Sequence, residues 1–132
     1  MMDAKTRQLV RDRAKNCCEY CGREQGSSTF PLQIEHVNPK KHGGTDASTN
    51  LALACIDCNL AKGPNLAGRE SGSEQLVPLF NPRTQDWNDH FELRGVLILG
   101  RTAIGRVTAI VLNFNSGDRL AQRAEQQREE RA

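Results

Sequence analysis

Five cysteines are the residues of this chain whose spacing points most directly to chemistry. Four of them form two C-x2-C pairs, Cys18 with Cys21 and Cys55 with Cys58, and 33 residues separate the pairs. Two residues between thiolates let a tight turn aim both sulfurs at one ion, and two such turns complete the tetrahedral shell of Zn2+. We therefore expect these four cysteines to hold one structural zinc ion. Cys17 is left as a spare thiol, although as a direct neighbour it is an alternative ligand to Cys18.

Paired cysteines also occur in redox proteins and in secreted disulfide frameworks. A thioredoxin-like site needs one reactive C-x-x-C in a βαβ unit, which two separated pairs fit poorly. The amino end has no apolar signal segment, which favours a reducing, cytoplasmic location over secretion. Metal binding is therefore the favoured use of these cysteines.

A second group of polar residues lies between the cysteine pairs and just after them. Glu35 and His36 are adjacent, Asn50 follows in the next segment, and Asn59 comes directly after Cys58. A histidine ordinarily titrates near about pH 6.5, so it is suited to accept a proton at neutral pH. A carboxylate with an amide oxygen is the kind of hard ligand set that Mg2+ prefers. Taken singly, these are a satisfied histidine, a helix cap and a turn residue, and only their joint spacing predicts a site.

Local patterns predict the elements that must position these residues. Residues 4–15 have high helix propensity and many basic side chains, and residues 31–37 alternate apolar and polar side chains as a strand does. A loop follows, Ser48 or Thr49 starts a short helix, and Asp57 caps a further helix that runs through residues 59–62. Zinc at the second cysteine pair would then fix Asn59 relative to the strand that carries Glu35.

The remaining half of the chain is predicted to contain a linker, a hairpin and helices. Residues 64–75 are rich in Gly, Ser and charge, as flexible linkers are. Thr84 is expected to cap a short turn that contains Trp87, residues 90–93 and 96–99 to form a hairpin, and Thr102 and Ser116 to cap two helices. We therefore predict an α+β protein with a core at residues 1–63, a linker at 64–75 and an extension at 76–132 that packs on or beside the core.

Composition limits the class of protein but does not identify its function. The chain has 132 residues and a formal net charge of +2, and its longest aliphatic run, Val96 to Leu99, is far too short to cross a membrane. Four zinc-bound thiolates and one Zn2+ would lower that charge to near zero. Attraction to phosphate must then be local, at the basic first helix and at Lys40 and Lys41.

The spaced positions resemble those of a known family, the HNH endonucleases with a ββα-metal fold. The resemblance covers residues 18–63 and consists of Cys18-x2-Cys21, Glu35-His36, Pro39, Gly43-Gly44, Asn50-Leu51, Cys55-x2-Cys58-Asn59 and Lys62-Gly63. It implies that His36 is the general base and that Asn50 braces the loop and aims the His36 ring. It further implies that Glu35 and Asn59 hold a catalytic Mg2+ or Mn2+. Glu35 stands where Asp is more frequent in the family, and Asn59 where His is frequent.

The second half resembles an extension found on many small bacterial HNH proteins. The positions that carry this resemblance are Leu79-Phe80-Asn81-Pro82-Arg83, Trp87, His90-Phe91, Gly100 and Gly105-Arg106. We expect this half to brace the nuclease core.

The resemblance implies a metal-dependent endonuclease that hydrolyses phosphodiester bonds, leaving a 5′ phosphate and a 3′ hydroxyl. Its expected partner is DNA, in duplex form and contacted through the phosphate backbone, because so small a unit has few side chains to spare for base edges. The alternative is a non-catalytic zinc module that binds nucleic acid or a protein, for which only the cysteines and the basic helix are needed.

Overall fold

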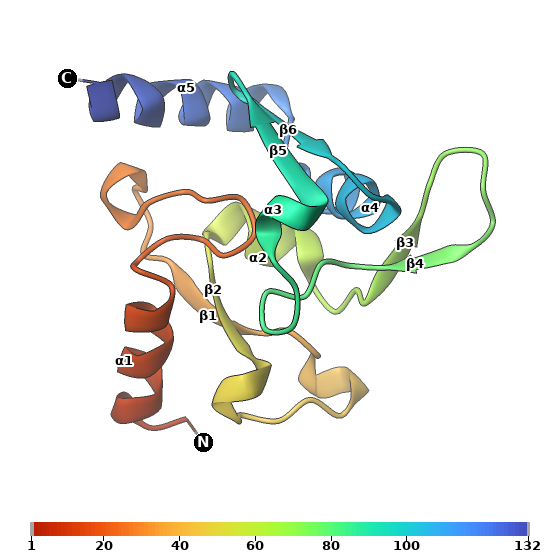
Figure 1. Cartoon of the computed structure of the whole chain (residues 1–132). Coiled ribbons are helices and arrows are strands. Elements are labelled where there is room, and N and C mark those ends of the chain that lie inside the picture. The colour runs from red at the N-terminus through yellow and green to blue at the C-terminus, as the bar shows by residue number, and fades with distance from the viewer. Residues whose placement is uncertain (1, 132) are drawn as a thin grey trace.

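The computed structural model describes residues 2–131 and shows an α+β fold (Figure 1). Three antiparallel hairpins, β1–β2, β3–β4 and β5–β6, are combined with five α-helices in the described residues. The elements are α1 (Ala4–Arg13), β1 (Gln33–His36), β2 (Leu51–Ala54), α2 (Ile56–Lys62), β3 (Ala67–Arg69), β4 (Leu76–Pro78), α3 (Trp87–His90), β5 (Phe91–Arg94), β6 (Leu97–Gly100), α4 (Ala103–Val111) and α5 (Gly117–Arg131). The α+β class predicted from the sequence is confirmed.

The first hairpin and the helix after it make up a ββα unit. β1 pairs with β2 from Gln33 opposite Ala54 to His36 opposite Leu51. All four residues of β2 are buried, and local patterns missed this strand because Leu-Ala-Leu-Ala has no polar alternation. Because α1 packs against β2, the strand becomes recognisable only once its surroundings are known.

Helix α1 begins where the sequence predicts, and two of its arginines bind backbone carbonyls. The Asp3 side chain accepts a hydrogen bond from the Thr6 backbone N–H and caps the helix. Arg11 and Arg13 donate to the Leu32 and Leu51 carbonyls, at 3.2 and 2.8 Å. Two of the basic groups expected to attract phosphate therefore fasten α1 to the segments beside the first hairpin.

Helix α2 begins at a cysteine rather than at the expected aspartate. The Cys55 sulfur accepts from the Cys58 backbone N–H at 3.4 Å, and Cys55 is the N-cap. Asp57 lies in the first turn instead, where its negative charge favours the helix dipole. The cap and the predicted metal ligand are thus the same residue.

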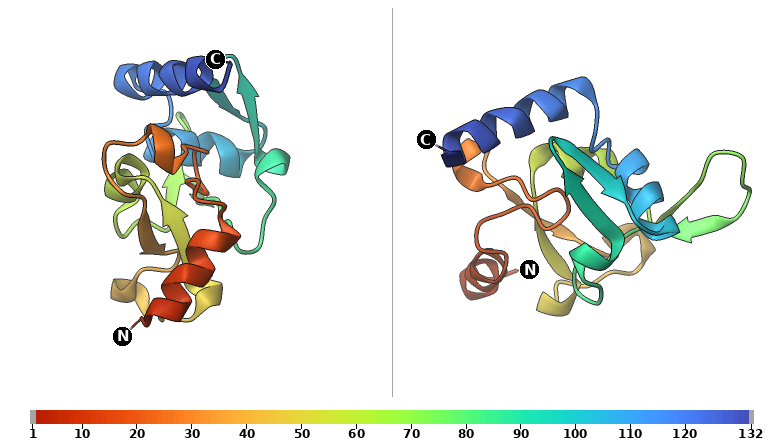
Figure 2. Two further views of the ribbon diagram at one scale, coloured as in Figure 1. Left: turned by 90° about the vertical axis from the view of Figure 1, so that its left-hand side faces the viewer. Right: turned by 45° about the horizontal axis from the view of Figure 1, so that its top comes forward.

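The segment predicted as a linker, residues 64–75, contains strand β3 and part of a hairpin. β3 pairs with β4 from Ala67 opposite Pro78 to Arg69 opposite Leu76. A Cβ on Gly68 would lie 2.8 Å from a Val107 methyl group and 2.9 Å from one of Val111. Because Gly68 has no side chain, α4 can approach this hairpin closely, so a glycine typical of linkers here serves packing. The β3–β4 hairpin projects from the body, as Figure 1 and the right-hand view of Figure 2 show.

The second half shares one hydrophobic core with the first. Phe80 packs edge-on against Tyr20 and Phe91, with ring centroids 6.5 and 5.3 Å apart. The Trp87 indole N–H donates to the Tyr20 carbonyl at 2.7 Å. The described part of the second half, residues 76–131, therefore packs directly on the core and shares its hydrophobic interior.

The elements of the second half follow their sequence signals closely. Thr102 caps α4 by accepting from the Gly105 N–H at 3.1 Å, as predicted. The β5–β6 turn contains Gly95 with φ of 62°, a left-handed conformation that glycine adopts at little cost. Helix α5 begins just after Ser116 and lies at the opposite end of the molecule from α1 (Figure 1). Within residues 2–131, no helix combines the length and apolar character needed to cross a membrane.

We predict that Gly105→Ala destabilises the fold by about 1–3 kcal/mol, the usual cost of overpacking a core. A Cβ at this buried position would lie 1.9 Å from the His90 carbonyl oxygen, so α4 must move away from the end of α3. Urea unfolding measures the change. The matched control is Gly117→Ala, also in a helix, whose Cβ meets nothing within 4 Å. Equal stability of the two variants would show that the approach of α4 to His90 is not tight.

Candidate zinc centre and active site

Four cysteine sulfurs converge where the turn at residues 18–22 meets the start of α2. The Sγ atoms of Cys18, Cys21, Cys55 and Cys58 all lie within 4.8 Å of one another. Backbone N–H groups point at two of them, from Cys21 to the Cys18 sulfur at 3.5 Å and from Cys58 to the Cys55 sulfur at 3.4 Å. Four thiolates in this arrangement fit the tetrahedral demand of Zn2+. The predicted zinc-binding set is thus brought together.

The structure also decides between the neighbouring cysteines. The Cys17 sulfur faces the Lys15 carbonyl at 3.4 Å and is not part of the cluster. Gly22, with φ of 82°, closes the turn by donating to the Cys18 carbonyl at 2.9 Å. Cys18 is therefore the member of the set, and Cys17 is the spare thiol.

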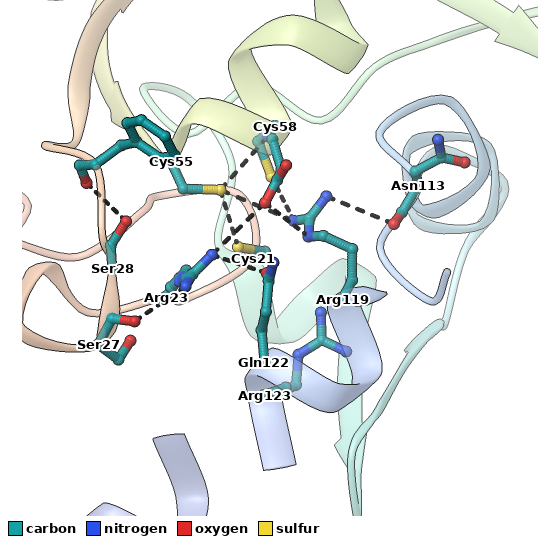
Figure 3. Close-up of polar contacts among 12 residues, drawn as sticks. Cys21, Arg23, Ser27, Ser28, Cys55, Cys58, Asn113, Arg119, Gln122 and Arg123 are labelled. Carbon is teal, nitrogen blue, oxygen red and sulfur yellow. Dashed lines mark hydrogen bonds and ion pairs between the residues drawn. The ribbon is translucent and has the colours of Figure 1, made fainter. Parts of the chain in front are cut away.

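Arg119 on α5 contacts the cysteine cluster, a relation that the sequence did not reveal. Its Nη2 donates to the Cys58 sulfur at 3.0 Å (Figure 3). Its Nη1 donates to the Leu112 carbonyl, also at 3.0 Å. Arg119 is only 5% exposed. Burial disfavours its charge, but the Cys58, Cys21 and Cys55 sulfurs outweigh this effect and raise its pKa above the ordinary value. A Zn2+ with four thiolates carries two negative charges, and Arg119 supplies positive charge beside them.

Two further residues attach α5 to this centre. Arg23, just after the first cysteine turn, donates to Gln122 at 2.8 Å and lies 3.6 Å from Asp57. Figure 3 shows Arg119 and Gln122 reaching from α5 toward the cysteines, with Arg23 approaching from the other side. Only the folded chain brings residues this far apart in sequence into contact.

His36 lies at the end of β1, beside an open depression. Its side chain is 22% exposed, and its Nε2 lies 2.7 Å from Asp46 Oδ1. Lys40 Nζ approaches the same Asp46 oxygen at 3.3 Å. The hydrogen bond with His36, and secondly that with Lys40, lower the pKa of Asp46 to about 2. The depression has a volume of about 400 Å3, and its lining includes Glu35, His36, Lys40 and Asn59.

Asn50 holds together the loop that follows His36. Its Oδ1 accepts from the Asn38 N–H at 2.8 Å, and its Nδ2 donates to the Asn38 and Thr45 carbonyls at 3.0 and 2.9 Å. Gly44 lies so close that a Cβ there would be 1.7 Å from the Asn38 oxygen. Asn50 lines a second hollow, of about 320 Å3, behind this loop.

Glu35 is held in the interior by two partners. It is 6% exposed, accepts a hydrogen bond from the Tyr20 hydroxyl and lies 3.2 Å from Lys62 Nζ. Burial raises the pKa of Glu35 above its ordinary value, while Lys62 and the Tyr20 hydroxyl oppose that rise. Lys62 also donates to the carbonyls of His36 and Val37, at 3.2 and 3.1 Å.

Lys62 therefore ties the end of β1 to α2. The sequence offered only one signal for this role, a Lys-Gly pair at the end of a predicted helix. Asp46 lies in the loop after β1, where no local pattern distinguishes it. Both roles depend on contacts with residues elsewhere in the chain.

The oxygen donors predicted for a catalytic cation border the same depression. Asn59 comes from α2, its Nδ2 donates to Gln33 Oε1 at 2.5 Å, and it lines the depression together with Glu35. A carboxylate and a carboxamide oxygen are donor types that suit Mg2+ or Mn2+. Because Lys62 is already paired with Glu35, a cation bound there would share that carboxylate with the lysine.

Comparison with known proteins identifies the central segment. Residues 18–65 match the family model described as HNH endonuclease. The match covers little more than a third of the chain and contains the four cysteines as well as Glu35, His36, Asn50 and Asn59. The chain therefore carries an HNH domain with a cysteine cluster suited to zinc, as the resemblance implied. Searches of curated proteins and of solved structures give no match.

We predict that Cys58→Ser loses zinc and at least about 4 kcal/mol of folding free energy, because metal-binding energy contributes to folding energy in small zinc domains. Cys17→Ser is the matched control and should keep zinc near one ion per chain, since its sulfur lies outside the cluster. Metal analysis and thermal unfolding measure both effects. Equal zinc contents in the two variants would contradict the assignment of ligands.

Arg119→Met should weaken zinc retention although it removes no ligand. Loss of the guanidinium leaves the Cys58 sulfur and the Leu112 carbonyl without this donor. Outer-shell partners of metal ligands typically change affinity by about 10- to 100-fold, so we expect faster transfer of zinc to a chelator. The control is Arg128→Met on the same helix, whose side chain is 65% exposed. Identical transfer rates would show that Arg119 does not support the metal.

Proposed function

We propose that the protein is a metal-dependent DNA endonuclease that hydrolyses phosphodiester bonds, with His36 as the general base. The HNH domain at residues 18–65 supports a nuclease-family function. The observation that carries the proposal is the position of His36, half-buried at a depression that it shares with Asn59 and Lys40. His36 offers a base, Asn59 an oxygen donor and Lys40 an ammonium group beside one open depression. These are groups that phosphodiester hydrolysis uses.

In the proposed reaction, the chain's own residues prepare the water and the phosphate. The unprotonated His36 imidazole takes a proton from the attacking water, and the resulting hydroxide attacks phosphorus opposite the departing 3′ oxygen. The ammonium groups of Lys40 and Lys41 lie at the loop beside His36 and would contact phosphate oxygens. Glu35 and Asn59 would hold a Mg2+ or Mn2+ ion, which when bound supplies positive charge for the phosphate and for the leaving oxygen.

The other residues at this site would position the reacting groups. Lys62 binds the His36 carbonyl at 3.2 Å and so holds the base relative to α2, the helix that carries Asn59. Asn50 spans the loop from Asn38 to Thr45 and limits the movement of the segment after His36. Small displacements of such groups lower catalytic rates strongly, so this bracing supports a catalytic interpretation of the loop.

One observation favours a second candidate, a zinc module that binds nucleic acid or protein without cleaving. Both carboxylate oxygens of Glu35 already have partners, Tyr20 and Lys62. If that ion pair serves only to stabilise the interior, Glu35 binds no cation. The two candidates then differ in whether His36 is needed for any reaction.

A plasmid-nicking assay with Mg2+ or Mn2+ separates the two candidates. His36→Ala should nick at least about 100-fold more slowly than the wild type, the lower range of a general-base contribution. It should keep its zinc and its melting temperature, because His36 lies outside the cysteine cluster. His42→Ala is the matched control, since the ring of that exposed loop histidine has its one hydrogen bond among the described residues with the Pro64 carbonyl. Cleavage unchanged in His36→Ala, or absent in the wild type with every metal, would favour the binding module.

A further inference from the structure

A loop carboxylate faces the proposed base directly. Asp46 comes from the loop after β1, and its Oδ1 lies 2.7 Å from His36 Nε2. The two side chains are 25% and 22% exposed, so each is largely shielded from water. No residue pattern around Asp46 predicted this contact.

We propose that Asp46 is a positioning residue that holds the His36 imidazole with Nε2 protonated and leaves Nδ1 to accept the proton from water. This inference rests on the proposed function of His36. A carboxylate accepts hydrogen bonds and does not donate them, so the ring nitrogen that faces it must carry the proton. In a neutral imidazole the other nitrogen then has the free electron pair.

The loop backbone fixes the place of Asp46. Asn50 Nδ2 donates to the carbonyl of Thr45, the residue just before Asp46, at 2.9 Å. Gly44 packs against the Asn38 carbonyl in a space that no side chain could share. The carboxylate therefore approaches His36 from a braced segment, as a positioning role requires.

The proton and electron pairs balance in this arrangement. An O–H bond of water breaks, its proton goes to Nδ1, and its electron pair forms the new bond to phosphorus. The bond from phosphorus to the 3′ oxygen breaks, and its pair stays on that oxygen, which takes a proton from solvent. His36 becomes a cation whose Nε2–H still faces the Asp46 carboxylate, so the charge formed during the step has a partner already in place.

Lys40 shares the same oxygen and must be tested separately. Its Nζ lies 3.3 Å from Asp46 Oδ1, and its side chain is 62% exposed. An exposed ammonium is suited to bind a phosphate of DNA. Lys40 should therefore affect substrate binding, whereas Asp46 should affect the chemical step.

The kinetic test compares Asp46→Ala, Asp46→Asn and Lys40→Met on a short duplex with Mg2+ or Mn2+. Asp46→Ala should lower kcat at least about 10-fold, with KM within about 2-fold, because a histidine without its oriented partner loses the productive ring position. Asp46→Asn should recover part of the rate, since the amide keeps an acceptor oxygen. Lys40→Met should instead raise KM. A wild-type kcat in Asp46→Ala, or an equal loss of kcat in Lys40→Met, would overturn the assignment.

A second measurement does not depend on cleavage. In 15N-histidine-labelled protein at alkaline pH, the His36 signal, identified with His36→Ala, should show a protonated Nε2 whose hydrogen exchanges slowly. That slow exchange should disappear in Asp46→Ala while zinc content and melting temperature stay unchanged. A His36 protonated at Nδ1, or exchange unaffected by Asp46→Ala, would overturn the proposal. If the wild type fails to nick, the proposed function fails, and the spectrum still decides whether Asp46 orients the ring.

Discussion

Four cysteine sulfurs lie within 4.8 Å of one another, and this convergence ties the turn at Cys18 to the start of α2. Cys55 is at once a member of the cluster, the residue after β2 and the N-cap of α2. The same position therefore fixes where the strand ends and where the helix begins. Because Asn59 follows Cys58 on that helix, the geometry of the cluster also sets the distance between Asn59 and the strand that carries His36. A metal at the cluster would stabilise the folded chain and, in the same step, assemble the candidate active site.

Two neighbouring residues of β1, Glu35 and His36, each pair with a charged side chain, but in different surroundings. Glu35 and Lys62 form a buried ion pair, 6% and 2% exposed, with Tyr20 as a third partner. Removing one member of such a pair leaves an uncompensated charge in the interior, so the pair enforces the arrangement of β1 and α2. His36 meets Asp46 where it lines the open depression that Glu35 also borders. The Glu35–Lys62 pair therefore fixes one edge of the depression to the interior, and His36 lies where substrate has access.

The second half of the chain makes direct hydrogen bonds with the first half. Arg119 donates to the Cys58 sulfur, and Trp87 donates to the Tyr20 carbonyl. Four thiolates around Zn2+ carry a net negative charge that a buried site must offset. In residues 2–131 the guanidinium that donates to these sulfurs comes from α5, so the second half supplies positive charge beside the cluster.

Features that depend on local spacing could be predicted from the sequence. The two cysteine pairs predicted the metal cluster, Thr102 predicted a helix start, and residues 90–93 and 96–99 were expected to form a hairpin. Such features depend on a few neighbouring residues. The motif from Glu35 to Asn59 predicted the HNH domain, since its residues keep a fixed spacing along the chain.

Other features became visible only in the folded chain. It showed that Leu51–Ala54 is a strand, that residues 64–75 join a hairpin, and that Cys18 and not Cys17 lies in the cluster. It also showed that Arg119 contacts Cys58, Lys62 contacts Glu35 and Asp46 contacts His36. Each of these features depends on contacts with residues far along the chain, as Gly68 depends on α4, or on burial of both faces of a strand. Local propensity contains no information about such partners, because their energies arise only when the chain has folded and removed them from water.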